Sequence, residues 1–289
     1  MVPAESGGRA WRGLGATAPA ALGDAWRQVH WAAQAPAALA EALIPKREDD
    51  SHVNLGWHEA AAALLTHPAG RLRAGVRPAD LALLVLDGDR VAEEWPLAGH
   101  SLEEAFGWIR GAAARVAGSE PPALARRDWD MPEHPVAGGG RLSGEPAAAF
   151  EEVARWYANA DLVLGGLAAA NRGASEVRCW PHHFDIATLV TLDADRSAEE
   201  ARSIGIGLAP ADGSIPEPYL YVNPWPAPEA EGELPTLEAG GEWYREDFFG
   251  ALLRASRLVE GGVPGQRERL ERFLRSAVAA GRRLVEEEG

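Results

Sequence analysis

The spacing of hydrophobic residues in the first half of the chain predicts two helices with short strands between them. Apolar side chains recur at helical intervals after Asp24 until Pro45, which cannot continue a helix. Strict alternation and a short apolar run followed by Asp87-Gly88 predict strands and a β-hairpin. Ser101 and Glu104 have the spacing of a capping box, which marks the start of the second helix. The predicted elements are helices at 24–44 and 102–116 and strands at 53–57, 81–86 and 91–95. The pattern at 60–65 fits a helix or a strand equally well.

The second half predicts the same order of elements. A long helix ends before Gly173, because glycine often follows the last helical residue. Four runs of β-branched, aromatic and apolar residues then predict strands, and the chain finishes in two amphipathic helices. The predicted bounds are 145–171, 242–259 and 264–287 for helices and 177–180, 184–192, 203–208 and 219–223 for strands. This order predicts an α+β fold in which antiparallel strands are flanked by long helices.

Shifts in composition predict four segments. An irregular leader at 1–23 precedes a first α+β half at 24–118, a linker at 119–144 is rich in Pro, Gly and charge, and a second α+β half covers 145–289. A shift of 125 positions matches Trp31 to Trp156 and His58 to His183, so one hypothesis is an internal duplication of two helix-strands-helix halves. The alternative hypothesis is that the two halves share this order of elements by coincidence.

Charge and cysteine content limit the partners. Asp and Glu total 43 against 28 Lys and Arg, and the net charge of -15 would repel a nucleic acid backbone and an anionic membrane alike. Cys179 is the single cysteine, which excludes an internal disulfide and fits a reducing compartment. We therefore expect a cytoplasmic protein without a nucleic acid or membrane partner, while a small polar molecule remains a possible partner.

The densest group of polar and aromatic residues runs from Trp180 to Ala187. In a strand, the two-residue period would place His183 and Asp185 on one face, with His182 on the other. An imidazole beside a carboxylate can form an acid/base pair, and His182 and Trp180 could then bind the ligand. Two alternatives stay open: a buried pair that only satisfies itself, and two ligands of a metal site completed by another histidine. We assign no metal.

Two further groups could line the same pocket. Alternation places Tyr219, Tyr221 and Asn223 on one strand face, close in sequence to Glu217, and a solvent-facing sheet edge is an equal alternative. The candidate ligand-binding residues of the first half are His52, Asn54 and His58. A turn that enters a strand would also explain the first two.

The order of three segments resembles the bacterial family catalogued as domain of unknown function 5996. These segments are His30-Trp31 in the first helix, the stretch Trp180–Ala187, and Pro216-Glu217-Pro218-Tyr219-Leu220-Tyr221. The resemblance covers most of the chain, although His182-His183 and 203–208 depart from the family pattern. Because no activity is established for that family, the resemblance implies no reaction and no cofactor.

The sequence shows no phosphate loop, dinucleotide fingerprint, nucleophile elbow or zincin helix. The expected function is therefore general: a polar and aromatic pocket around His183 and Asp185. As an enzyme, it would use His183 as acid or base, Asp185 to hold its tautomer, and Tyr219 or Tyr221 as donor to the substrate. As a binding or structural protein, it would use the same residues for recognition or as a satisfied network. The sequence does not decide between an enzyme and a binding protein.

Overall fold

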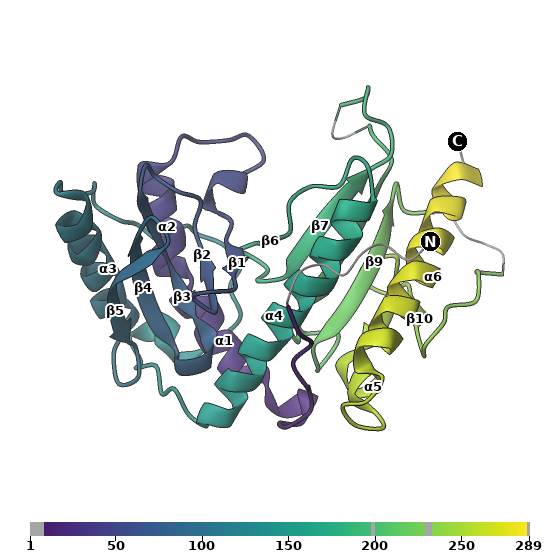
Figure 1. Cartoon of the computed structure of the whole chain (residues 1–289), viewed down its shortest axis with the longest axis horizontal. Helices are drawn as coiled ribbons and strands as arrows, with labels where there is room; N and C mark the ends of the chain where they lie inside the picture. Colours follow the sequence, from purple (N-terminus) through teal and green to yellow (C-terminus); the bar gives the residue numbers. More distant parts are fainter. Residues whose placement is uncertain (1–8, 198–199, 229–232, 288–289) are drawn as a thin grey trace. The chain divides into compact units, whose positions relative to one another are not determined.

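The computed structural model describes residues 9–197, 200–228 and 233–287, and it confirms an α+β fold with antiparallel sheets (Figure 1). The chain forms two compact units. The N-terminal unit comprises Ala21–Ala158 and Arg178–Asp185, and the C-terminal unit comprises Met1–Ala20, Asn159–Val177 and Ile186–Gly289. The boundary therefore falls inside the helix α4 (Ala147–Ala170), rather than in the expected linker. Of the expected leader, residues 1–8 lie outside the described residues.

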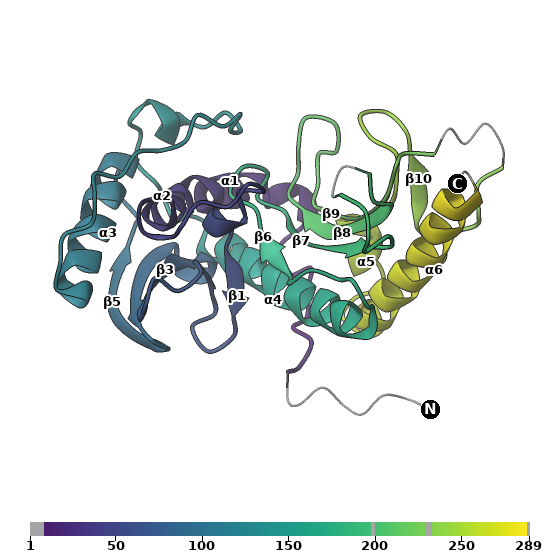
Figure 2. The same ribbon diagram turned by 90° about the horizontal axis from the view of Figure 1, so that it is seen from above.

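The sheet of the N-terminal unit is an antiparallel meander in sequence order. Its strands are β1 (Gly56–His58), β2 (Ala63–Leu65), β3 (Leu72–Arg77), β4 (Ala82–Asp87) and β5 (Arg90–Pro96). The predicted hairpin joins β4 to β5, where Gly88 adopts a positive φ of 62°. Two helices, α2 (Gln34–Leu43) and α3 (Leu102–Ala117), pack on the sheet, and α1 (Gly23–Ala32) packs against both of them (Figure 2). Short 3-10 helices at Ser51–Val53, Pro78–Asp80 and Pro135–Gly138 complete the unit.

The helix expected at 24–44 is two helices. The break lies at Ala33, because Pro36 has no N–H to donate to the carbonyl of Ala32 and its ring would clash with that carbonyl. Asp24, which we expected as the residue that caps the start of this helix, lies inside its first turn, since α1 begins at Gly23. The capping box at α3 is confirmed: Glu104 N–H donates to Ser101 Oγ, and Ser101 N–H donates to the Glu104 carboxylate.

The segment at 119–144, expected as a linker, is packed within the N-terminal unit. Val136 and Leu142 are buried, and Gln28 in α1 accepts hydrogen bonds from the N–H groups of Ser143 and Gly144. The segment contains little regular structure, so its backbone polar groups bind side chains of the helices instead. Its Pro and Gly content therefore indicates an irregular path and not a free connection.

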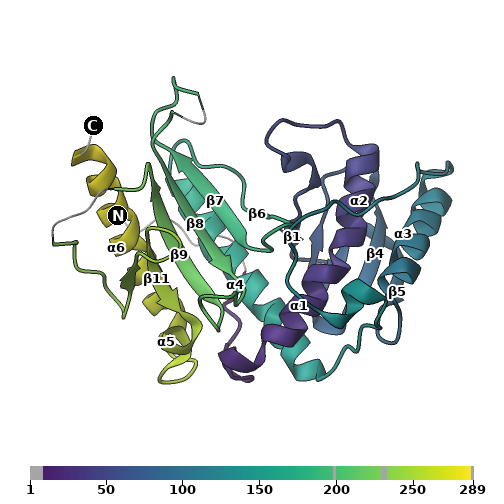
Figure 3. The same cartoon turned by 180° about the vertical axis from the view of Figure 1, so that it is seen from behind.

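The sheet of the C-terminal unit contains five strands in the order β10-β11-β9-β8-β7, all antiparallel. They are β7 (Ile186–Thr191), β8 (Ser203–Ala209), β9 (Tyr219–Trp225), β10 (Glu242–Tyr244) and β11 (Gly250–Arg254). The helix α6 (Gln266–Glu287) packs on one face, and Figure 3 shows the strands from the opposite side. The remaining elements are the short strand β6 (Arg178–Cys179), which belongs to the N-terminal unit, the helix α5 (Ala255–Val259) and the 3-10 helix Pro19–Ala21.

The prediction of a helix at 242–259 was wrong over most of its length. Those residues form β10, β11 and only then α5. Ala251, Leu252 and Leu253 are all fully buried, and a run of consecutive buried apolar residues fits a strand covered on both faces as well as it fits a helix. Pairing of β11 with β9 decides the outcome, and that pairing is a long-range contact which a local pattern does not contain.

The duplication stays a prediction. Both units contain helices and an antiparallel sheet, but only the N-terminal sheet is a meander throughout, and the aligned residues differ in local structure. His58 lies in β1, whereas His183 lies in a turn, and the break between α1 and α2 has no counterpart in the uninterrupted α4. None of the helices in the described parts of the chain has the length and hydrophobicity that a bilayer span requires.

Candidate functional site

Residues 180–185 form a closed turn before β7, so the prediction that His183 and Asp185 share one face of a strand was wrong. The N–H of Trp180 donates to the carbonyl of Asp185 at 2.9 Å, and the N–H of Phe184 donates to the carbonyl of Trp180 at 2.6 Å. Phe184 has a φ of +60°, in the left-handed region. A single left-handed residue interrupts the two-residue period, and the side chains on either side of it no longer alternate as they would in a strand.

Two side chains of the helix pair α1–α2 hold this turn. His30 Nε2 and Gln34 Nε2 each donate a hydrogen bond of 2.8 Å to the carbonyl of Pro181. A carbonyl only accepts, so the proton of His30 lies on Nε2. The ring of His30 also stacks on Phe184 with centroids 4.7 Å apart and planes within 4°. Burial lowers the pKa of His30 to about 4, which keeps the ring neutral at pH 7.

The inner side of the turn carries a buried polar group. Tyr157 donates a hydrogen bond of 2.7 Å to the carbonyl of Phe184 and accepts one of 2.8 Å from Trp26 Nε1. Burial, and then the negative charge of Asp185, raises the pKa of the Cys179 thiol well above its usual value. Cys179 is therefore a protonated core residue. The charge of the half-buried Asp185 acts on this interior group, which the acid/base hypothesis did not include.

The outer side of the turn carries the two histidines. His183 is exposed, His182 is half-buried, and their ring centroids lie 4.4 Å apart. The His182 ring is also 5.8 Å from Trp129 and 6.0 Å from Trp180. Burial, together with the charge of His183, lowers the pKa of His182 to about 4. At pH 7 His182 is a neutral ring that can donate or accept a hydrogen bond.

His52, predicted as a ligand-binding residue, is the buried member of a partly exposed ionic network. Its Nδ1 accepts from the N–H of Arg47 at 3.3 Å, so Nε2 carries the proton and donates to Glu41 at 2.9 Å. Arg127 from the 119–144 segment pairs with Glu41 at 2.5 Å and with Asp50 at 2.9 Å. The Arg127 hydrogen bond lowers the pKa of Asp50. His52 is completely buried, so this network fixes the segment on α2 and does not present the imidazole to a ligand.

Asn54 and His58 have structural partners as well. Asn54 is buried, and its Oδ1 accepts hydrogen bonds from Arg178 at 2.7 Å and His67 at 2.9 Å. His58 Nδ1 accepts from the N–H of Ala61 at 3.2 Å, and its Nε2 lies 3.8 Å from Asp89. Both residues therefore stabilise the loops around β1 and β2.

The remaining predicted residues lie in the C-terminal unit. Alternation on β9 is as predicted, since Leu220 and Val222 are buried while Tyr221 and Asn223 are half-buried on the other face. Glu217 accepts hydrogen bonds from the N–H and hydroxyl of Ser256, and Tyr219 donates to Asp212 at 2.7 Å. Both contacts hold loops around the strand. The predicted reach of His183 to Tyr219 or Tyr221 stays a prediction, because these residues belong to different units.

The glycines of β8 allow Tyr221 and Asn223 to lie across the neighbouring strand. A Cβ on Gly207 would come within 2.6 Å of the Tyr221 hydroxyl, and one on Gly205 would collide with Asn223 Oδ1. Glycine at these two positions therefore serves close packing. Trp225 at the end of β9 is half exposed on the same face.

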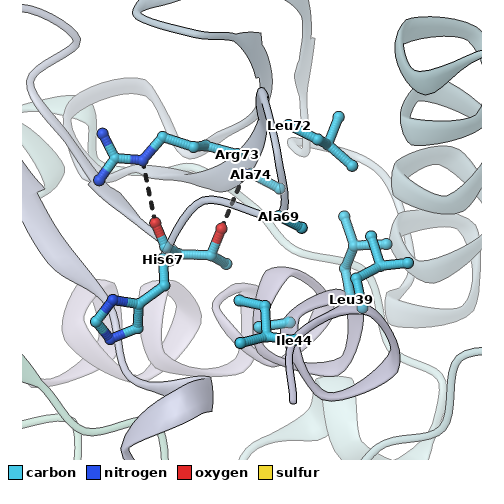
Figure 4. Close-up of a pocket in the computed structure, with 10 residues that line it drawn as sticks. Leu39, Ile44, His67, Ala69, Leu72, Arg73 and Ala74 are labelled. Carbon is cyan, nitrogen blue, oxygen red and sulfur yellow. Dashed lines mark hydrogen bonds between the residues drawn. The ribbon is translucent and has the colours of Figure 1, made fainter.

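Two small cavities lie in the N-terminal unit. One of about 10 Å³ is lined by Gln34, Glu41, Arg127 and Trp129, together with apolar residues of α2 and Val53. The other, also of about 10 Å³, lies between α2 and the loop before β3, where Figure 4 shows Leu39, Ile44, His67 and Arg73 around it. There Arg73 donates to the Thr66 carbonyl at 3.2 Å, so its guanidinium is partly used by the backbone.

A larger, open cavity of about 400 Å³ was not predicted. Its lining comes from α1, the first turns of α3 and the 119–144 segment. The apolar part consists of Trp31, Leu102, Phe106, Val136, Ala137 and Gly139, and the polar part of Ser101, Glu103 and Arg126. We name this the α3 cavity. Its residues are scattered over about a hundred positions of an irregular sequence, so no local motif identifies them.

The Arg126 guanidinium carbon lies 5.0 Å from the centroid of the Trp31 ring, a cation–π contact that holds the side chain at the cavity. Trp31 is itself fixed by a hydrogen bond of 3.0 Å from its Nε1 to the carbonyl of Pro132. Within the part of the chain that the structure describes, no group of three or more His, Cys, Asp or Glu side chains is arranged to hold a metal ion.

Comparison with known proteins adds no further constraint: no family model, no curated protein and no solved structure matches this chain.

Proposed function

We propose that this protein binds a small molecule in the α3 cavity of its N-terminal unit. The observation that carries this proposal is the cavity itself: about 400 Å³ of space lined by five apolar residues and a glycine together with three polar side chains. Small-molecule sites are concave and mostly apolar, with a few polar groups that orient the ligand. The two other cavities described hold only about 10 Å³ each, which leaves no room for a ligand.

The construction of the cavity wall supports binding. One wall is the 119–144 segment, which is held to the helices by side-chain contacts at Gln28, Trp31 and Glu41 and contains little regular structure. An irregular segment of this kind adjusts to a ligand at lower cost than a helix or strand. The opposite wall is α3, whose capped first turn is a fixed platform.

The experiment is a thermal-shift screen of metabolites against the wild-type protein and Ala137→Trp. Ala137 is exposed and lines the cavity, so an indole there fills the space without disturbing the core. A ligand of the native state raises the melting temperature. We expect compounds that stabilise the wild type to lose their effect on Ala137→Trp and to keep it on Ala123→Trp, an exposed position outside the cavity. Equal stabilisation of all three proteins would place the binding site elsewhere.

A second candidate is the outer side of the 180–185 turn, where His182 lies beside Trp129, a residue that also lines one of the two small cavities. With a pKa of about 4, His182 suits hydrogen-bond recognition better than proton transfer near pH 7. The acid/base role of His183 with Asp185 is the catalytic form of this candidate. In either form, His183→Ala should remove ligand stabilisation and change the melting temperature of the ligand-free protein little, because His183 is exposed.

We further propose a cytoplasmic location and no nucleic acid partner. The net charge of -15 and a sole cysteine that is a buried free thiol support both. The resemblance to domain of unknown function 5996 remains a hypothesis and supplies no activity.

A further inference from the structure

The α3 cavity carries one positive and one negative side chain that the protein itself does not neutralise. Within the described residues, neither Arg126 nor Glu103 forms an ion pair or side-chain hydrogen bond, and they do not pair with each other. Two other arginines of the N-terminal unit do have carboxylate partners. Arg110 pairs with Glu120 at 3.1 Å and Arg141 with Glu104 at 3.2 Å.

The contact with Trp31 presents Arg126 in a useful orientation. A guanidinium that lies over an aromatic ring keeps its N–H groups at its edge, where they can bind a carboxylate through two parallel hydrogen bonds. The ring contact replaces the carboxylate partner that an arginine in a protein usually has. Arg126 is therefore positioned to receive an anionic group from outside the chain.

Glu103 differs from Glu104 beside it. The Glu104 carboxylate is occupied by the capping box and by Arg141, whereas Glu103 is exposed at the cavity without a partner in the described chain. An ammonium group in the cavity would find its counter-charge there. Phe106 and Val136, which also line the cavity, provide an apolar surface for the rest of the ligand.

We propose that the ligand of the α3 cavity is a small aminocarboxylate with an apolar side chain. Its carboxylate binds Arg126, its ammonium group binds Glu103, and its apolar part packs against Phe106 and Val136. This assignment rests on the proposed function and adds the chemical class of the ligand. A ligand with both charges leaves neither cavity residue unpaired, whereas a ligand with one charge leaves the other unsatisfied.

The test is calorimetric titration of the full chain with three probes: L-phenylalanine, 3-phenylpropionate, which lacks the ammonium group, and 2-phenylethylamine, which lacks the carboxylate. We expect phenylalanine to bind at least about tenfold more tightly than either analogue, because a charge-assisted hydrogen bond is worth about 1.4 kcal/mol or more. Arg126→Gln should remove its advantage over phenylethylamine, and Glu103→Gln its advantage over phenylpropionate. Arg90→Gln, at an exposed arginine of β5, should change neither ratio.

Three results would overturn the assignment. If an analogue with one charge binds as tightly as phenylalanine, and Ala137→Trp still prevents binding, the cavity is a binding site but its ligand is not an aminocarboxylate. If none of the three probes binds, the assignment is also wrong, and the metabolite screen with Ala137→Trp decides the proposed function separately. The melting temperature and the circular dichroism spectrum of Arg126→Gln show whether the variant is folded. If the folded variant loses the binding of all three probes equally, including phenylethylamine, Arg126 does not act through the carboxylate and the assignment is wrong.

Discussion

Gln266 binds both backbone polar groups of Leu14: its Oε1 accepts from the Leu14 N–H at 3.0 Å, and its Nε2 donates to the Leu14 carbonyl at 2.9 Å. Asn159 in α4 binds Arg12 in the same way: its Oδ1 accepts from the Arg12 N–H at 2.9 Å, and its Nδ2 donates to the Arg12 carbonyl at 2.7 Å. The segment 9–15 is therefore held on the C-terminal unit by two side-chain amides that replace the partner strand it lacks. The sequence indicated only an irregular leader here, whereas from residue 9 the segment is an ordered strap whose Leu14 is buried.

Replacing Gln266 by Leu should destabilise the protein. The side chain is fully buried, and its loss leaves the N–H and carbonyl of Leu14 without these partners. Each buried group left unsatisfied costs about 1 to 3 kcal/mol, so with two such groups we expect the free energy of unfolding in urea to fall by about 2 to 6 kcal/mol. Arg267→Gln, at the exposed next position, should change it by less than about 0.5 kcal/mol. Similar values for the two variants would contradict a structural role for the strap.

Two glycines should respond in opposite directions to alanine. Gly75 in β3 has no room for a Cβ, because the backbone carbonyl carbon of Leu64 would lie 2.9 Å away and its oxygen closer still. Gly107 in α3 is exposed, and nothing lies within 4 Å of the position of a Cβ. Gly75→Ala should lower the free energy of unfolding by about 1 to 3 kcal/mol. Gly107→Ala should raise it by about 0.5 to 1 kcal/mol, since alanine is the better helix former. Chemical denaturation measures both, and destabilisation by Gly107→Ala would refute the argument.

The elements that the sequence predicted well are those whose signal is local. The hairpin between β4 and β5 follows from Asp87-Gly88, and the start of α3 follows from the reciprocal capping of Ser101 and Glu104. In both cases, a few neighbouring residues make the contacts that define the element. Pro36 carried an equally local signal for the break between α1 and α2, and its meaning was missed.

The candidate site depended on contacts that a local pattern does not contain. A left-handed phenylalanine has no sequence signature, because Gly, Asn and Asp are the residues that usually adopt this conformation. Phe184 adopts it where His30 stacks on its ring and Tyr157 binds its carbonyl, and both partners are far away in the sequence. The α3 cavity is similarly assembled from three distant segments, so Arg126 appeared in the sequence only as one charge in an irregular stretch.

Nucleic acid should not bind this protein at physiological salt. The net charge of -15 opposes contact with phosphates, and most arginines in the described parts of the chain are engaged by carboxylates or carbonyls. We expect no shift of duplex or single-stranded DNA in a gel at micromolar protein concentration. A gel shift that weakens as salt is added would contradict this prediction, because it would show that a local basic surface binds DNA despite the negative net charge.

Acid should destabilise the protein through His30. Its folded pKa of about 4 lies below the value of 6.5 for an unfolded histidine, mainly because the ring is buried, so the unfolded chain binds more protons between these two values. The stabilising contribution is complete above about pH 6.5 and is lost as the pH falls towards 4, which amounts to a loss on the order of 3 kcal/mol. His30→Gln keeps an amide that can donate to Pro181 but cannot titrate. The number of protons taken up on unfolding, which sets the slope of the unfolding free energy against pH, should therefore be smaller by up to one in this range. Urea denaturation of both proteins from pH 7.5 to 4.5 measures the difference, and parallel curves would show that His30 is not the group responsible.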